Sequence, residues 1–226
     1  MEKKEFYRHA LPHFQQPGQA YFVTWSLIDA IPPNALVEYT DKLHLLYLRI
    51  KQANDKNGDF LLLNSLKSEF NLTRRKYLKA FDDLLHEQKI SIVNLSKEAN
   101  RTILINALTF LEGKKLENYA FCIMSNHVHW VLWVYDTDEN GNQVYLQDIL
   151  QSVKRSSATL INKIEGISGA LWQKESYDTT IRDDNHLYNA IDYTINNPVK
   201  AGLVTNWYEW KGTRLFNDTS EILKPV

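Results

Sequence analysis

The chain has 226 residues, of which 44% are hydrophobic and 12% aromatic, so its composition is that of a globular protein and excludes an intrinsically disordered one. Its 26 Lys and Arg residues nearly balance 27 Asp and Glu residues, and the net charge of -1 excludes a global positive field that would attract nucleic acid. The single cysteine, Cys122, excludes an intramolecular disulfide. Without an apolar run of roughly 18 residues or the apolar core of a signal peptide, we expect a soluble cytoplasmic protein that is not in a membrane.

The first part of the chain predicts one strand followed by two helices. Residues 20–27 are rich in aromatic and β-branched side chains, which is typical of a strand. Residues 40–55, capped by Thr40 or Asp41, and residues 72–89 have helical periodicity. The basic run at 74–76, within a stretch that resembles a helix-turn-helix, has two interpretations. It either contacts DNA or belongs to a solvated helix face, which the charge pattern favours.

The most apolar segment, YAFCIMSNHVHWVLWV at 119–134, predicts a hairpin. It follows a stretch at 98–112 whose apolar residues form one helical stripe. Sixteen residues are too many for one ordinary strand, and the Ser-Asn pair in the middle favours a turn. We therefore expect strands at 119–124 and 127–135.

The last part of the chain alternates between helix and strand. Residues 145–164 predict a helix, residues 171–181 a turn with a short strand, and residues 182–197 a helix that Pro198 and Gly202 end. The order is strand, helix, strand, strand, helix, strand, helix, with two extra helices after the first strand. This order predicts an α+β sandwich with a mostly antiparallel sheet.

Two histidines, His127 and His129, lie one residue apart on the second hairpin strand. Side chains at i and i+2 of a strand point to the same face, so each histidine can offer a ring nitrogen to one point in space. The pair either holds a divalent metal or is satisfied by hydrogen bonds in a packed sheet. A metal site also needs a third ligand.

The last helix carries candidates for that ligand and for a nucleophile. Asn189, Tyr193 and Asn197 are spaced i, i+4, i+8 and line one polar stripe. A tyrosine and an amide there reach a metal beside the histidines, or Tyr193 anchors the helix and Asn197 caps its end. Tyr177 is a rival nucleophile, but its own element has no ligand partner. Spacing alone leaves these alternatives open.

Five blocks of the sequence together resemble one family. They are LPHFQQPGQAYFVTW, SNHVHWVL, ILQSVKRSSATLINK, LWQKESYDTTIRDDNHL and YTINNPVKAGLV, in this order. This pattern is similar to that of the REP-associated tyrosine transposases, a branch of the single-tyrosine HUH transposases with a PNHVHLLL block. Ser125 stands where the family usually has proline, and Thr194 where it often has isoleucine. Neither position is an expected metal ligand or the expected nucleophile.

The resemblance implies a ferredoxin-like catalytic domain that spans residues 1–226, with 38–90 as a helical insertion. It further implies that His127 and His129, with Asn197 as third ligand, hold Mg²⁺ or Mn²⁺, and that Tyr193 attacks the scissile phosphate of single-stranded DNA. The products are a 5′-phosphotyrosine and a free 3′-hydroxyl. The expected partner is single-stranded DNA with a hairpin (a REP-like palindrome), and the expected assembly is a monomer or homodimer.

Basic side chains near the expected site are candidates for DNA phosphate contacts, which position a strand but do not read its sequence. They are Lys154, Arg155, Lys163, Lys174, Arg182 and Lys200. The alternative for each is solvated surface. Trp172 and Trp207 either stack on unpaired bases or pack in the core.

Three other functions share some of these features. A cupin-type metal enzyme also has an H-x-H strand, but it needs a following glutamate and a later strand histidine that this sequence lacks. A non-catalytic DNA-hairpin binder derived from a transposase remains an alternative. So does a metal-dependent phosphodiesterase without a covalent step, which would still cut DNA after the substitution Tyr193→Phe.

Overall fold

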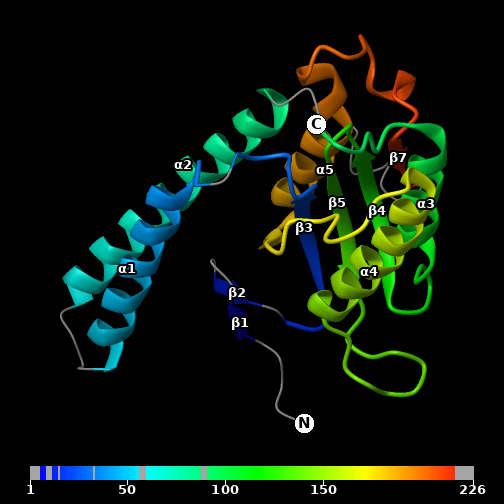
Figure 1. The fold of residues 1–226 in the computed structure, drawn as a ribbon. Coiled ribbons are helices and arrows are strands. Elements are labelled where there is room, and N and C mark those ends of the chain that lie inside the picture. Colours follow the sequence, from blue (N-terminus) through cyan, green and yellow to red (C-terminus); the bar gives the residue numbers. More distant parts are fainter. Residues whose placement is uncertain are drawn as a thin grey trace.

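The centre of the protein is a five-stranded antiparallel sheet with the order β6-β3-β5-β4-β7 (Figure 1). The computed structural model describes residues 6–8, 12–14, 16–32, 34–55, 60–87 and 91–216. The strands of the sheet are β3 (Gln19–Ser26), β4 (Leu116–Ile123), β5 (His127–Val134), β6 (Tyr177–Thr180) and β7 (Thr213–Leu215). Two short strands, β1 (Phe6–Arg8) and β2 (Pro12–Phe14), form a separate antiparallel pair.

Helices cover both faces of the sheet. Helices α3 (Glu98–Thr109) and α4 (Leu146–Glu165) pack on one face, and α5 (Asp184–Lys200) packs on the other. Helices α1 (Val37–Asp55) and α2 (Phe60–Glu87) contact each other and extend to one side of the sheet (Figure 1). A short 3₁₀ helix, η1 (Trp207–Glu209), follows α5.

The alternation of side chains along β5 determines what each face of the sheet carries. Val128, Trp130 and Leu132 point into the main core against α3 and α4, whereas Val131 belongs to the smaller core under α5. His127 and His129 share the parity of Val131 and therefore face α5. The strand pattern thus places both histidines against the last helix.

The predicted fold class is confirmed. Elements β3, α3, β4, β5, α4 and β6 form two interleaved βαβ units whose strands lie in the sheet order of a ferredoxin-like sandwich. The hairpin prediction is also correct: Ile123 pairs with Val128, and the Met124 N–H donates a hydrogen bond of 2.9 Å to the His127 carbonyl. Helices α1 and α2 are the extra pair after the first strand.

The division into one domain with an insertion at 38–90 stays a prediction. Within that range, residues 56–59 and 88–90 lie outside the described residues. No helix in the described ranges is both long enough and apolar enough to cross a membrane.

The helix-turn-helix interpretation is wrong. Residues 60–87 form one continuous helix, so the basic run at 74–76 lies on a helix side and not on a recognition helix after a turn. Helix α1 starts at Val37, about one turn before the predicted cap, and the Thr40 hydroxyl bonds the Val37 carbonyl inside the helix. Thr40 and Asp41 were predicted as caps because they are polar, but the helix already begins three or four residues earlier.

Pro198 does not end the last helix, contrary to the sequence-based expectation. Proline removes only one backbone donor, and α5 continues to Lys200. The end comes at Gly202, whose φ of +67° allows the Ala201 and Leu203 amides to bond the carbonyls of Asn197 and Pro198. Gly202 therefore ends the helix, as predicted.

Strand β7, which the sequence did not predict, depends on a close approach at Gly212. The Ile123 N–H donates to the Gly212 carbonyl at 3.0 Å, and the Trp210 indole N–H donates to the Ile123 carbonyl at 2.9 Å. A Cβ on Gly212 would overlap the Ile123 carbonyl oxygen and lie 2.8 Å from Trp210 Nε1. Glycine is thus required for β7 to reach β4.

We expect Gly212→Ala to lower the free energy of unfolding by about 1–3 kcal/mol, because the added methyl group forces the β7 segment away from β4. Lys211→Ala, at the exposed neighbouring position, is the matched control and should be close to neutral. Urea denaturation of both variants measures the difference. Equal midpoints for Gly212→Ala and the wild type would contradict the close approach.

Candidate active site

His127 and His129 lie side by side at the start of β5, and each is 1% exposed. Their Nε2 atoms are 3.1 Å apart. The Nδ1 atom of His127 lies 2.7 Å from Asn126 Oδ1, and the Nδ1 atom of His129 lies 2.7 Å from Thr24 Oγ1. The structure therefore brings the two predicted histidines together with one nitrogen of each directed at a common point.

The proton position on His127 follows from its neighbour. The Asn126 side-chain amide donates from Nδ2 to the Leu85 carbonyl at 3.0 Å, so its oxygen is the end that faces His127. An amide oxygen only accepts, hence His127 carries its proton on Nδ1 and a lone pair on Nε2. This is the tautomer that a metal ligand requires, with the other nitrogen held by a hydrogen bond.

Burial keeps both imidazoles neutral. Removal from water, reinforced by the nearby His86, lowers the pKa of His127 to about 3, although a hydrogen bond with Asn197 opposes the shift. The pKa of His129 is also well below its usual value, because of burial first and the neighbouring His127 second. At neutral pH the pair therefore carries no positive charge.

Tyr193 lies over this pair on the buried side of α5. Its ring centroid is 5.3 Å from that of His129 and 5.7 Å from that of Phe22. The phenol donates a hydrogen bond to Asp82, and the Lys200 ammonium lies 4.1 Å from the ring centroid. Burial, followed by the negative charge of Asp82, raises the pKa of the phenol above its usual value.

Asn197 is fully buried one turn after Tyr193. Its Oδ1 lies 3.3 Å from His86 Nε2, and its Nδ2 has no hydrogen-bond partner among the described residues. The amide of Asn197 also lies close enough to His127 and Tyr193 to act on the pKa of both side chains. Its side chain therefore points into the site and does not cap the end of the helix.

Asp82 and His86, which the sequence analysis did not identify, complete this cluster from α2. They are spaced i, i+4, with 3.9 Å between Asp82 Oδ2 and His86 Nδ1. Each contacts one residue of α5, Asp82 the Tyr193 hydroxyl and His86 the Asn197 amide. The only sequence signal was an acid and a histidine, one turn apart, at the edge of the apolar face of a predicted helix.

The donor atoms fit a divalent cation. Among the described residues, no three His, Cys, Asp or Glu side chains are arranged to hold a metal, so the histidine pair needs a different third ligand. The unpartnered amide end of Asn197 lies in this site, and exchanging its N and O would turn an oxygen toward it. Two imidazole nitrogens with an oxygen are ligands that suit several divalent ions.

Three of the predicted DNA contacts lie away from the histidines. Lys154, Arg155 and Lys163 are on α4, which covers the opposite face of the sheet. Lys154 donates to the Gln173 carbonyl at 2.7 Å, and burial lowers its pKa to about 8, so it anchors the loop before β6. Helical spacing placed these residues on a common exposed side but could not say which face of the sheet the helix covers.

The other basic candidates differ in their distance from the site. Lys200 contacts the Tyr193 ring, and Arg182 lines a cavity beside α2. Lys174 is exposed in the loop before β6. Trp172 packs in the main core, where its indole N–H donates to Ser157 Oγ at 3.1 Å, and Trp207 packs against the smaller core.

Tyr177, the rival nucleophile, lies on β6 with its hydroxyl 2.8 Å from Thr179 Oγ1. Its ring contacts Phe22 at 6.3 Å and the Arg74 guanidinium at 5.3 Å. No ring contact joins it to either histidine in the described structure, whereas Tyr193 has one. His186, near the start of α5, donates its backbone N–H to the capping side chain of Asp183.

Comparison with known proteins gives one curated relative and one solved structure. No family model matches the chain. A Haemophilus influenzae protein named "putative REP-associated tyrosine transposase" is 29% identical over 118 residues, which cover 50% of this chain and 67% of that protein. The structure of a REP-associated tyrosine transposase bound to a REP hairpin superposes with a TM-score of 0.48 and 15% identity, over 97% of this chain and 87% of that one. The similarity to the curated protein agrees with the resemblance of the five sequence blocks: over half of its length, the chain is similar to a protein named as a putative REP-associated tyrosine transposase.

Proposed function

We propose that this protein is a metal-dependent single-stranded DNA transesterase, a transposase that cleaves beside DNA hairpins through a 5′-phosphotyrosine. The observation that carries the proposal is the position of Tyr193, whose ring lies 5.3 Å from His129, while His129 Nε2 faces His127 Nε2 at 3.1 Å. A nucleophile beside paired neutral imidazoles is the combination that metal-assisted phosphodiester cleavage needs. The resemblance of the five sequence blocks, together with the similarity to a putative REP-associated tyrosine transposase, makes a REP-like hairpin the proposed substrate. The cytoplasmic location and the assembly as monomer or homodimer stay predictions.

The divalent ion would be held by His127, His129 and Asn197. When bound, it supplies positive charge to the scissile phosphate and orients that phosphate for in-line attack. Mg²⁺ prefers sites made of oxygen ligands alone, so two imidazoles favour Mn²⁺ over Mg²⁺ at equal concentration. Asn126 holds the Nδ1 proton of His127 and Thr24 contacts Nδ1 of His129, so these two side chains would orient both Nε2 atoms toward the ion.

Asp82 accepts the proton of the nucleophile. The Tyr193 hydroxyl already donates to this carboxylate, so the proton moves along an existing hydrogen bond as the phenol oxygen bonds to phosphorus. The bond between phosphorus and the 3′-oxygen breaks, and the leaving oxygen takes up a proton from water to become the free 3′-hydroxyl. The Lys200 ammonium over the ring favours the negative charge that develops on the phenol.

The covalent link preserves the energy of the phosphodiester bond. A 3′-hydroxyl can attack the phosphotyrosine and rejoin DNA without ATP. A hydrolytic phosphodiesterase would release a phosphate end and could not rejoin the strand. Tyr193 therefore distinguishes strand transfer from simple cleavage.

The first test is Tyr193→Phe. Wild-type protein with Mn²⁺ and a labelled hairpin-bearing single strand should give a protein–DNA adduct on a denaturing gel, and Tyr193→Phe should give none, because phenylalanine lacks the attacking oxygen. Tyr188→Phe, five residues earlier on α5 and exposed, is the matched control and should form the adduct.

Each other result of this test selects an alternative. An adduct that survives in Tyr193→Phe but disappears in Tyr177→Phe would move the nucleophile to β6. Cleavage without an adduct would indicate a phosphodiesterase. Hairpin binding without cleavage at any metal concentration would favour the non-catalytic binder.

The second test is Asp82→Asn, which keeps the hydrogen-bond acceptor but cannot take up a proton. We expect adduct formation to slow by about 100-fold or more, the usual contribution of a general base. Asp83→Asn, an exposed neighbour on the same helix, should change the rate little. Since Asp82 raises the pKa of the phenol, a faster reaction in Asp82→Asn would show that the carboxylate only restrains Tyr193 and would overturn its role as base.

The third test measures the ligands by Mn²⁺ binding alone, using the electron paramagnetic resonance signal of free Mn²⁺. His129→Ala should abolish binding, and Asn197→Ala should weaken it by about 10-fold or more. Asn196→Ala, the adjacent amide that bonds Asp192 instead, is the matched control. Wild-type affinity in Asn197→Ala would remove Asn197 from the ligand set, and wild-type affinity in His129→Ala would refute the metal site.

A further inference from the structure

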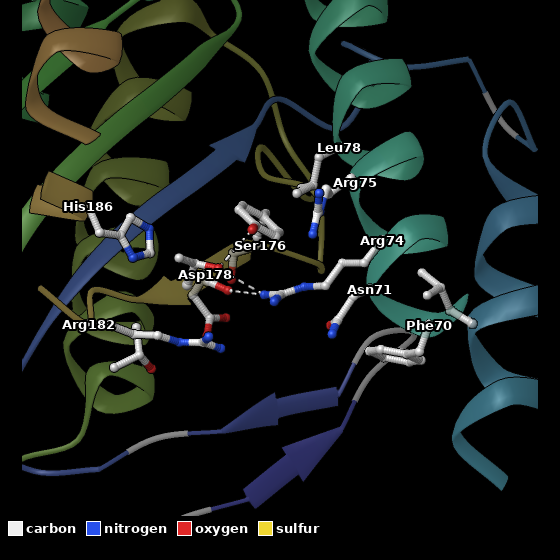
Figure 2. Close-up of a pocket in the computed structure, with 13 residues that line it drawn as sticks. Phe70, Asn71, Arg74, Arg75, Leu78, Ser176, Asp178, Arg182 and His186 are labelled. Atoms are coloured by element: carbon white, nitrogen blue, oxygen red, sulfur yellow. Dashed lines mark hydrogen bonds between the residues drawn. The ribbon is translucent and has the colours of Figure 1, made fainter. Parts of the chain in front are cut away.

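A groove leads away from Tyr193 between α2 and β6. Next to the catalytic cluster lies a cavity of about 370 Å³, whose lining includes His129 and Tyr193. A larger cavity of about 570 Å³ continues between α2, β6 and the start of α5 (Figure 2). Leu78, Tyr177 and His186 line both cavities, so the two form one continuous groove.

One stripe of α2 forms a wall of this groove. Arg74, Leu78, Asp82 and His86 are spaced four residues apart and therefore lie on one side of the helix. The first two line the outer cavity, and the last two contact Tyr193 and Asn197. The same helix side that holds the catalytic residues thus continues outward along the groove.

The outer part of the groove carries two kinds of arginine. Arg74 is fixed: it donates to the Asp178 carbonyl at 3.1 Å and to Thr179 Oγ1 at 2.9 Å, and it lies over the Tyr177 ring. Arg75 and Arg182 are exposed and have neither a hydrogen bond nor an ion pair within the described part of the chain. Figure 2 shows Arg74 and Arg182 reaching into the cavity from opposite sides. Among the described residues that line the outer cavity, three are arginines and one, Asp178, is acidic, so the lining is positively charged.

We propose that this groove binds the single-stranded DNA that continues from the scissile phosphate, an inference that rests on the proposed function. Arg75 and Arg182 bind successive phosphates, for which the planar guanidinium is well suited. Tyr177, held from one side by Arg74, packs against a base where the two cavities join. A cavity of about 570 Å³ has the size of a small-ligand pocket, which admits individual nucleotides and not a duplex.

The proposal assigns a role to the helical pair α1–α2. This pair is additional to the sheet and its covering helices, and its long helix supplies two of the three arginines at the groove. The strand would lie between α2 and β6, with its scissile phosphate at Tyr193 and its continuation toward Arg182.

The experiment measures binding of a fluorescent hairpin with single-stranded flanks by anisotropy, at several salt concentrations. Each phosphate contact on a single strand contributes about 0.7 to the slope of log affinity against log salt. Arg75→Gln and Arg182→Gln should each reduce the slope by about that amount, and the double variant by about 1.4. Arg49→Gln, with the same charge change on exposed α1 outside the groove lining, is the control and should keep the wild-type slope.

The results distinguish the proposed DNA-binding groove from the proposed reaction at Tyr193. Unchanged slopes in both arginine variants, with the adduct at Tyr193 intact, would overturn the groove and leave the proposed function standing. Reduced slopes without any adduct in the wild type would support the groove as a DNA site and refute the transesterase. The same loss of affinity on a fully duplex DNA without flanks would overturn the assignment to a single strand.

A second variant, Ser176→Trp, fills the outer cavity from the residue before β6. It should weaken binding of the flanked hairpin to the level of the double arginine variant.

Discussion

The hydrogen bond between His127 and Asn126 is the contact on which the candidate site depends. Asn126 lies in the turn between β4 and β5, and its amide is oriented by the Leu85 carbonyl near the end of α2. This orientation decides the tautomer of His127 and so places its lone pair toward His129. One buried amide therefore connects a hairpin turn, the end of a long helix and the chemistry of the imidazole. In a buried setting an incorrect orientation would leave two polar groups unsatisfied, which costs more than the bond itself contributes.

Helix α2 is the element that distinguishes this molecule from a plain ferredoxin-like sandwich. It touches the sheet and α5 at points along its length: Arg74 at β6, Leu85 at the β4–β5 turn, and Asp82 and His86 at α5. These contacts are polar, and they reach the same side of the sheet as the histidines. A helix held by specific polar contacts has a defined register against its neighbours, because a shift by one residue would break them all. The positions of the Tyr193 hydroxyl and the Asn197 amide are set by that register.

Sequence reasoning recovered those parts of the site that lie on one element. The i, i+2 spacing of His127 and His129 fixes their common face wherever the strand lies, and the i, i+4 spacing of Tyr193 and Asn197 does the same on a helix. The contribution of α2 could not be recovered in this way, because Asp82 and His86 reach the candidate site only through contacts with residues more than 40 positions away along the chain. The same applies to Lys154, which the sequence placed on an exposed helix side but whose ammonium is partly buried against the loop before β6.

Two features of the fold, β7 and the end of α5, were not predicted correctly for a more local reason. Strand β7 has three residues, too few for any alternation to be recognised, and it forms because Gly212 permits a close approach to β4. Pro198 is a strong helix breaker only in a helix interior, and in the last turn the Gly202 cap decides where α5 ends.

The charges of the proposed site are divided between two places. The ligands at its centre are neutral, since burial keeps both imidazoles uncharged and Asn197 has no charge. The nearby carboxylate, Asp82, accepts a hydrogen bond from the Tyr193 hydroxyl.

A divalent ion on neutral ligands keeps most of its charge until an anion binds, so a DNA phosphate and the ion would stabilise each other's binding. By linkage the effect would be mutual: DNA would tighten the metal as much as the metal would tighten DNA. The arginines lie along the groove and not at the histidines, so they would attract the strand without repelling the ion. Such a division would let a protein with a net charge of -1 bind a polyanion along this groove.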